Sequence, residues 1–136
     1  MDARHAFRIL LVEDDHYIAK IIGLGMQTLG MPYHLDQAIS AEEGLDLWDE
    51  QPYDIVLTDY NLRGKNGVKM IEELKRRGAI APMVLFTAYD SAATRREAAA
   101  VGVNAFLSKP FLIDEFVGTT RKLLAAREKE QAVGAA

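Results

Sequence analysis

Short apolar runs recur along the chain, separated by longer stretches in which apolar residues follow helical spacing. The runs cover residues 9–12, 33–38, 55–58, 83–86 and 105–107, and each is typical of a strand. The stretches after them predict five helices. Because nearly continuous apolar strands alternate with helices, we expect an α/β fold with a parallel sheet covered on both faces, a doubly wound (βα)5 sandwich.

Glycines mark several helix boundaries in this pattern. Gly30 and Gly78 stand where two of the predicted helices would end. Gly23 and Gly25 instead fall inside the first predicted helix, where glycine costs roughly 1 kcal/mol relative to alanine. Close packing of the helix at these positions would explain them, but the pattern alone does not.

The length and composition fit one domain. The chain has 136 residues, of which 49% are apolar, which is enough to bury a core without disulfides or a structural metal. We expect the domain to cover residues 1–127. Residues 128–136 would form a tail that is either disordered or the fraying end of the last helix.

Composition also excludes several classes of function. The absence of cysteine removes disulfides, thiolate zinc sites and cysteine nucleophiles, and His5, His16 and His34 have no metal-ligand spacing. The sequence has neither a signal-peptide pattern nor a run of ~18 apolar residues, so we expect a cytoplasmic protein without membrane insertion. A net charge of −4 argues against direct nucleic-acid binding.

Polar residues follow the ends of four predicted strands. Glu13 and Asp14 follow the first strand and Asp59 the third, whereas Thr87 and Lys109 follow the last two. Side chains at the carboxyl ends of parallel strands share one crevice. Three carboxylates there would repel strongly unless a cation lay between them, and their hard oxygen ligands suit Mg²⁺, with Mn²⁺ as a substitute.

Each of these polar residues also has an ordinary structural interpretation. Asp14 or Asp15 could cap the first helix, Asp59 alone could be a turn residue, and Lys109 and Thr87 alone could be a solvated lysine and a strand-end hydroxyl. Together they form a set suited to phosphoryl transfer. That chemistry needs a nucleophile, which would be Asp59, with cations and hydrogen-bond donors around the transferring oxygens.

These positions give the sequence a resemblance to the receiver domain of bacterial two-component and phosphorelay response regulators. The resemblance covers about residues 7 to 127, and its motifs are Ile-Leu-Leu-Val-Glu-Asp at 9–14, Asp59, Thr87-Ala88 and Lys109-Pro110-Phe111. It implies the flavodoxin-like fold of the chemotaxis regulators, with strand order 2-1-3-4-5. Asp15 would then belong to the start of the first helix.

The resemblance also implies a phosphorylation site. Asp59 would accept a phosphoryl group from a sensor histidine kinase or a histidine phosphotransfer protein. Asp14 and Asp59 would bind Mg²⁺ directly, Glu13 mainly through water, and Asn61 through its backbone carbonyl. Beyond its own phosphorylation and dephosphorylation, the protein would not be a conventional enzyme.

A conformational switch is the third implication of the resemblance. Thr87 and Phe106 would respond to the phosphoryl group, and the peptide bond between Lys109 and Pro110 would be cis. From periodicity alone, an ordinary core aromatic is the favoured interpretation of Phe106, and only the resemblance makes it a switch candidate. The output face would be formed by helix four, strand five and helix five, and its candidate residues are Arg95, Arg96, Phe106 and Lys122.

Two positions deserve separate interpretation. Arg63 stands where the family usually carries proline, which puts the kinase contacts of that loop in doubt. Tyr89 lies two residues beyond Thr87, where a bulky side chain could hinder water attacking an acyl phosphate. We therefore expect slow self-dephosphorylation.

Two competing functions remain open from sequence. A phosphohydrolase of the haloacid-dehalogenase type would need a second acid two residues after its nucleophile, where this chain has Asn61. A phosphorylation-independent protein-binding module would need no chemistry at Asp59. The sequence specifies neither the downstream protein target nor a homodimer, although phosphorylation-dependent dimerisation is compatible with it.

Overall fold

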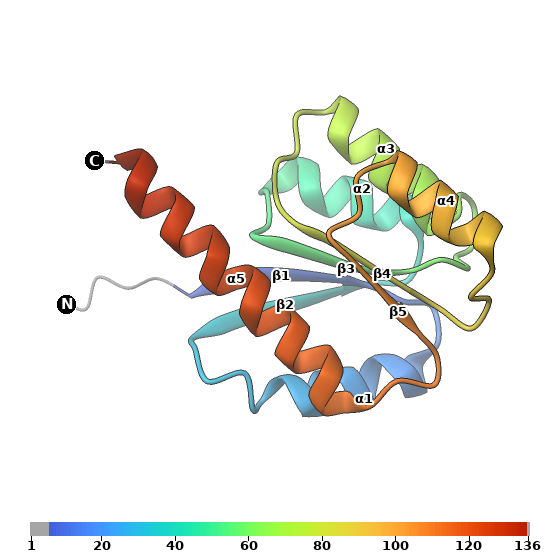
Figure 1. Cartoon of the computed structure of the whole chain (residues 1–136), viewed down its shortest axis with the longest axis horizontal. Helices are drawn as coiled ribbons and strands as arrows, with labels where there is room; N and C mark the ends of the chain where they lie inside the picture. Colours follow the sequence, from blue (N-terminus) through green and yellow to red (C-terminus); the bar gives the residue numbers. More distant parts are fainter. Residues whose placement is uncertain (1–5, 136) are drawn as a thin grey trace.

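The structure, a computed structural model that describes residues 6–135, contains a five-stranded sheet with helices on both faces (Figure 1). The strands are β1 (Phe7–Val12), β2 (Tyr33–Ala38), β3 (Ile55–Asp59), β4 (Met83–Thr87) and β5 (Ala105–Ser108). The helices are α1 (His16–Met26), α2 (Ala41–Glu50), α3 (Gly67–Arg76), α4 (Ala92–Ala100) and α5 (Ile113–Ala135). Strand and helix alternate along the whole described chain, as predicted.

The strand order is β2-β1-β3-β4-β5, and every pair of neighbouring strands is parallel. This confirms the predicted order and the doubly wound class. The order reverses between β1 and β3, because the chain goes from β1 to one edge of the sheet and then returns to its other side. In such sheets, a crevice opens beyond the carboxyl ends of the two strands at the reversal.

Two apolar cores cover the two faces of the sheet. One core packs α2, α3 and α4 against alternate strand residues such as Val12 and Leu85, and the other packs α1 and α5 against Leu11 and Phe86. Figure 1 shows α1 and α5 on one side of the strands and the other three helices opposite. Since β1, β3 and β4 are buried on both faces, their near-continuous apolar runs are the expected pattern.

The glycines within and after the helices have different structural reasons. Gly30 and Gly78 have φ of 83° and 90°, the left-handed region that glycine adopts most readily after a helix. A Cβ atom on Gly25 would lie 3.1 Å from the side chain of Ile113, so Gly25 allows α1 to approach the start of α5. Nothing in the structure explains Gly23, whose position would leave a Cβ in open space.

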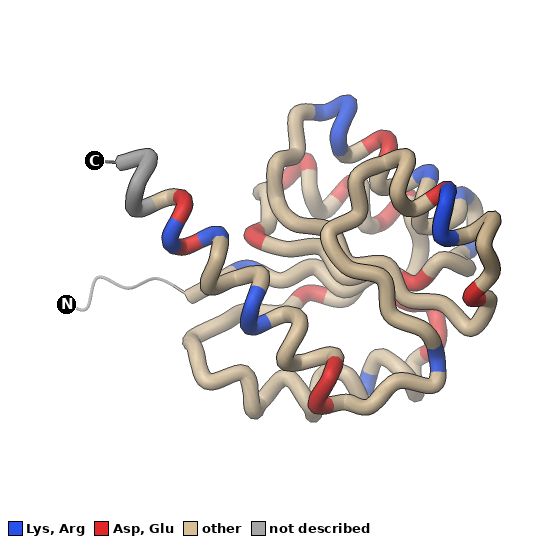
Figure 2. Tube along the Cα trace, viewed as in Figure 1, with Lys and Arg blue, Asp and Glu red and all other residues tan. Residues whose placement is uncertain are grey.

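Helix α5 continues well beyond the sheet. Its first half is anchored to the core by the buried side chains of Phe116, Val117 and Leu124. Residues 128–131 are exposed, and acidic and basic side chains alternate along this part of the helix (Figure 2). The helix continues through residues 128–135, and the Glu, Lys, Gln and Ala residues of this segment are strong helix formers. Residues 1–5 and 136 lie outside the described chain.

Candidate functional site

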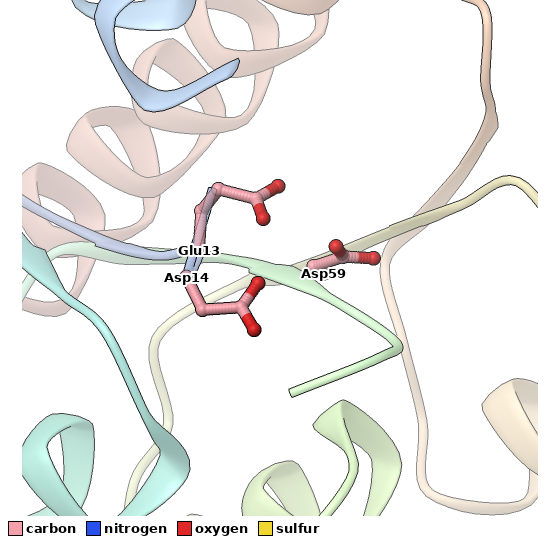
Figure 3. A group of neighbouring side chains, drawn as sticks. All are labelled: Glu13, Asp14 and Asp59. Carbon is pink, nitrogen blue, oxygen red and sulfur yellow. The ribbon is translucent and has the colours of Figure 1, made fainter. Parts of the chain in front are cut away.

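The polar residues predicted to converge lie at the carboxyl ends of neighbouring strands. Glu13 and Asp14 follow β1, Asp59 ends β3, Thr87 ends β4, and Lys109 follows β5. The carboxyl groups of Glu13, Asp14 and Asp59 lie within 4.8 Å of one another, grouped beyond the strand ends in Figure 3. The sheet topology therefore builds one acidic pocket from two segments that are 45 residues apart in the sequence, counting from Asp14 to Asp59.

Asp15 has a different role from its acidic neighbours. Its carboxylate accepts hydrogen bonds from the amides of Tyr17 (2.9 Å) and Ile18 (3.2 Å), which makes it the N-cap of α1. The assignment of Asp15 to the helix start is confirmed. The Asp14 carboxylate instead lies with those of Glu13 and Asp59 (Figure 3).

Glu13 is the most deeply buried of the three acids, with 1% of its surface exposed. Its Oε2 accepts the amide of Asp15 at 3.1 Å, whereas Oε1 has no hydrogen-bond partner among residues 6–135 and lies 3.5 Å from Nζ of Lys109. Burial, and then the nearby charge of Asp59, raises the pKa of Glu13 to about 7. A buried carboxylate oxygen without a donor fits a site that a divalent cation completes.

Asp59 is 5% exposed, and its carboxylate accepts two hydrogen bonds. Its Oδ2 accepts a hydrogen bond from Nζ of Lys109 at 3.0 Å, and its Oδ1 accepts one from the amide of Asn61 at 3.3 Å. Lys109 is itself largely buried, and its ammonium lies 5.4 Å from the centre of the Phe86 ring. A fixed positive charge therefore stands directly beside the Asp59 carboxylate.

Thr87 is fully buried at the end of β4. Its hydroxyl accepts a hydrogen bond from the amide of Tyr89 (3.0 Å), and its carbonyl accepts one from the amide of Lys109 (2.7 Å). The peptide bond from Lys109 to Pro110 is cis. Phe106, two residues before Ser108 on β5, is half-buried, packs against the core on the α2, α3 and α4 side of the sheet, and lies under the guanidinium of Arg95.

Two further features of the site were not recognised from sequence. A Cβ atom on Gly67 would lie 2.3 Å from the carbonyl oxygen of Asp59, so only glycine fits at the start of α3. Arg63 reaches back toward the acidic pocket, with Nε 3.8 Å from Oδ2 of Asp14, and its backbone pairs with Ser40. The position of Gly67, directly after the helix-capping Asn66, is the only sequence signal for the first feature.

An apolar hollow of about 400 Å³ borders the site. It is lined by α1 and by the segments after β4 and β5, and its residues are Ile18, Ile21, Ala88, Lys109, Pro110 and Phe111. Large apolar side chains on the same elements are exposed, namely Tyr17, Ile21 and Leu24 on α1 and Leu112 before α5. An apolar surface therefore borders the site through Lys109, whose ammonium donates to the Asp59 carboxylate.

The fold and this arrangement of acids, threonine and lysine define a class of signalling domain. The family model for the response regulator receiver domain matches residues 9–121. The chain therefore belongs to the response regulator receiver domain family. Receiver domains generally bind Mg²⁺ and receive phosphoryl groups from histidine kinases, and the pocket of Glu13, Asp14 and Asp59 could hold such an ion.

Individual relatives agree with this membership. The chain is 33% identical over 116 residues to the transcriptional regulatory protein YkoG of Bacillus subtilis, covering 85% of this chain and 50% of that protein. It is 31% identical over 117 residues to the transcriptional regulatory protein QseB of Escherichia coli O157:H7, covering 86% and 52%. The chain thus spans about half the length of these relatives.

Solved structures agree with the fold. A CheY-like response regulator receiver domain protein from Methanospirillum hungatei superimposes with a TM-score of 0.85 at 24% identity, covering 93% of this chain and 99% of that one. The signal receiver domain of a Luxo repressor protein from Vibrio parahaemolyticus gives a TM-score of 0.88 at 19% identity, covering 95% and 98%. Among residues 6–135, no helix combines the length and apolar character that a membrane span needs.

Proposed function

We propose that the protein accepts a phosphoryl group on Asp59 from the phosphohistidine of a histidine kinase or a histidine phosphotransfer protein. The observation that carries this proposal is the Asp59 carboxylate itself. It lies at the carboxyl end of a central strand, 3.0 Å from the Lys109 ammonium and beside the carboxylates of Glu13 and Asp14. Nucleophile, cation and metal ligands therefore meet at one point.

The reaction is an in-line displacement at phosphorus. One oxygen of Asp59 attacks the phosphorus atom, the new O–P bond forms as the P–N bond breaks, and the donor imidazole leaves with the electron pair. Lys109 holds positive charge beside the oxygens of the arriving group. Attack of water on the same phosphorus later restores the carboxylate and releases inorganic phosphate, so the chain catalyses both halves of its own cycle.

Glu13, Asp14, Asp59 and the backbone carbonyl of Asn61 are the groups that would hold Mg²⁺ or Mn²⁺. The partnerless Oε1 of Glu13 and the close approach of three carboxyl groups fit such an ion. A bound divalent cation supplies positive charge for the phosphoryl oxygens. The hydrogen bonds from Lys109 and from the Asn61 amide orient the Asp59 carboxylate, and the burial of Glu13 and Asp59 limits the access of bulk water to it.

The phosphoryl group would then change the surface formed by α4, β5 and α5. The Thr87 hydroxyl, which accepts the Tyr89 amide in the free chain, would donate to a phosphoryl oxygen instead. Phe106 would turn inward in response, and the altered surface would control a downstream protein. The relatives named as transcriptional regulatory proteins support a regulatory output, without identifying this target.

The apolar hollow beside the site supports docking of the phosphodonor there. Ile18 and Ile21 on α1 and Pro110 and Phe111 after β5 line it, so a partner helix with an apolar face could bury them and still present its histidine to Asp59. This is a second observation in favour of a protein phosphodonor over a small substrate.

The test is the intact mass of the protein after incubation with acetyl phosphate and Mg²⁺. We expect one phosphoryl adduct that a chelator prevents and that Asp59→Asn abolishes. Asp46→Asn, the same substitution at an exposed position on α2, should leave the adduct unchanged. An adduct that survives Asp59→Asn contradicts the assignment of the acceptor.

The alternatives give different results in the same series. A phosphohydrolase would release phosphate from small phosphate esters in steady turnover. A phosphorylation-independent binding module would show no adduct with acetyl phosphate, with beryllofluoride or with any kinase, and would keep partner binding in the Asp59→Asn variant.

A further inference from the structure

Three elements meet at a polar cluster near the end of β4. Asp90 belongs to the loop between β4 and α4, Arg95 to α4, and Ser108 to the end of β5. The Asp90 carboxylate accepts Nε of Arg95 at 2.6 Å on Oδ1 and Nη2 at 2.9 Å on Oδ2, and the Ser108 hydroxyl also donates to Oδ2. We call these three side chains the clasp.

The clasp holds Arg95 over an aromatic ring. Cζ of Arg95 lies 4.4 Å from the centre of the Phe106 ring. The planar guanidinium thus binds the Asp90 carboxylate through its edge and the ring through its face, two contacts that lysine could not make together. Phe106 is half-buried, and Arg95 covers part of the side that would otherwise be exposed.

The geometry separates this cluster from an ordinary surface ion pair. Isolated exposed ion pairs contribute little to the stability of a protein. A bidentate arginine–carboxylate pair with additional hydrogen bonds, however, fixes the orientation of the guanidinium. The hydrogen bonds from Arg95, and then from Ser108, lower the pKa of Asp90 to about 2. Asp90 is therefore ionised throughout the neutral range, and the closed clasp is its ordinary condition in this structure.

Helix α4 has little else to hold it in place. Only Thr94 and Ala98 are buried along its nine residues, so its apolar contact with the sheet is small. A second side-chain link to the site, among residues 6–135, is the hydroxyl of Tyr60, which donates to Glu97 at 2.7 Å. Polar contacts therefore add to a small apolar contact, made mainly by Ala98, in holding α4 against the sheet.

The clasp is also connected to the buried hydroxyl at the site. Thr87 pairs with Ser108 across β4 and β5, and the Thr87 hydroxyl accepts the amide of Tyr89, the residue immediately before Asp90. If the Thr87 hydroxyl left Tyr89 for a group on Asp59, the loop that carries Asp90 would lose its anchor to the strand.

We propose that Asp90, Arg95 and Ser108 form a clasp that keeps Arg95 over Phe106 while Asp59 is free, and that opens when Asp59 is phosphorylated. This regulation rests on the proposed function, because phosphorylation is what opens the clasp. Contacts present in only one of two states stabilise that state, so removal of the clasp favours the phosphorylated form. The clasp thus sets how strongly a phosphoryl group must act to release Phe106 from Arg95 so that the ring can turn inward.

The experiment compares Arg95→Ala with Arg96→Ala, the neighbouring exposed arginine, which forms no ion pair within residues 6–135. Calorimetry gives the affinity for beryllofluoride in the presence of Mg²⁺. We expect Arg95→Ala to bind about fivefold more tightly than the unaltered chain, at the low end of ordinary coupling between sites. Arg96→Ala should bind as the unaltered chain does, and Ser108→Ala should shift in the same direction by less.

Amide hydrogen exchange in the unmodified chain provides a readout that does not depend on phosphorylation. Arg95→Ala should accelerate exchange in the loop 88–91 and in α4, and Arg96→Ala should not. Equal beryllofluoride affinity in the two variants, or unaltered exchange in Arg95→Ala, overturns the clasp. Failure of the unaltered chain to bind beryllofluoride instead contradicts the proposed function, and the exchange result still decides whether the closed clasp orders α4.

Discussion

Replacement of Glu13 by glutamine should stabilise the metal-free protein at neutral and alkaline pH. Glu13 is 1% exposed, its Oε1 lacks a hydrogen-bond partner within residues 6–135, and Asp59 places a second negative charge nearby. Its pKa is raised from 4.5 to about 7 in the folded chain, first by burial and then by that charge. Glutamine keeps nearly the same shape and never ionises.

The direction and size of this stability change follow from the linkage between proton binding and folding. The pKa of Glu13 is higher in the folded chain than in the unfolded chain, so the folded chain binds the Glu13 proton more tightly. The stabilisation from this proton is complete below about pH 4.5 and is lost as the pH rises to about 7. The difference of about 2.5 pKa units corresponds to at most about 3 kcal/mol. Glutamine should recover up to that amount at pH 8 and far less at pH 5.

Urea unfolding with a chelator present, at pH 5 and pH 8, measures this difference. Glu128→Gln, an exposed position on α5, is the matched control and should leave the free energy of unfolding unchanged. With Mg²⁺ added, the unaltered protein should gain more stability than Glu13→Gln, since the variant has lost a metal ligand. Equal stability of Glu13→Gln and the unaltered chain at pH 8, or a larger gain at pH 5, would refute the reasoning.

Three further predictions concern other parts of the molecule. Gly67→Ala should lower the free energy of unfolding by about 1–3 kcal/mol and reduce phosphorylation, because its Cβ would lie 2.3 Å from the Asp59 carbonyl. Gly23→Ala, whose Cβ would lie in open space, should instead raise the free energy of unfolding by about 0.5–1 kcal/mol. Thermal melts measure both changes, and similar effects at the two positions would contradict this reasoning. Tyr89, which is 65% exposed beside the site, should shield the acyl phosphate, so Tyr89→Ala should lose its phosphoryl adduct faster in a mass-resolved time course, and an unchanged rate would exclude shielding. The pKa of Asp90 is lowered to about 2, so the ionised carboxylate stabilises the fold above about pH 4, and this stabilisation is lost as the pH falls toward 2. Asp90→Asn should therefore flatten the acid-unfolding curve between about pH 4 and about pH 2. Identical curves for the variant and the unaltered chain would disprove this prediction.

Local patterns in the sequence were sufficient for the architecture. Apolar runs such as residues 55–58 and 83–86 predict strands buried on both faces, and only a parallel sheet covered by helices on both sides accommodates many of them. The strand order came from the family resemblance rather than from periodicity. The sequence left the end of α5 open, because a polar stretch such as residues 127–131 suits both a solvated helix and a disordered tail.

Much of the site was also predictable, since its residues stand directly after strands. Glu13, Asp59 and Lys109 had to converge once the sheet was parallel. The contacts of Gly67 and Arg95 could not be foreseen, because the first depends on a close backbone approach and the second on a loop, a helix and a strand meeting in space. Neither leaves a periodic signal in the sequence.

The most direct test of the central claim is the chemical identity of residue 59 after phosphorylation. Borohydride reduces an acyl phosphate of aspartate to homoserine, so treatment after incubation with acetyl phosphate and Mg²⁺, followed by peptide sequencing, marks the acceptor. We predict homoserine at position 59 and unaltered aspartate at position 14. Homoserine at another acidic position, with residue 59 still aspartate, would contradict the assignment of Asp59 as the phosphoryl acceptor.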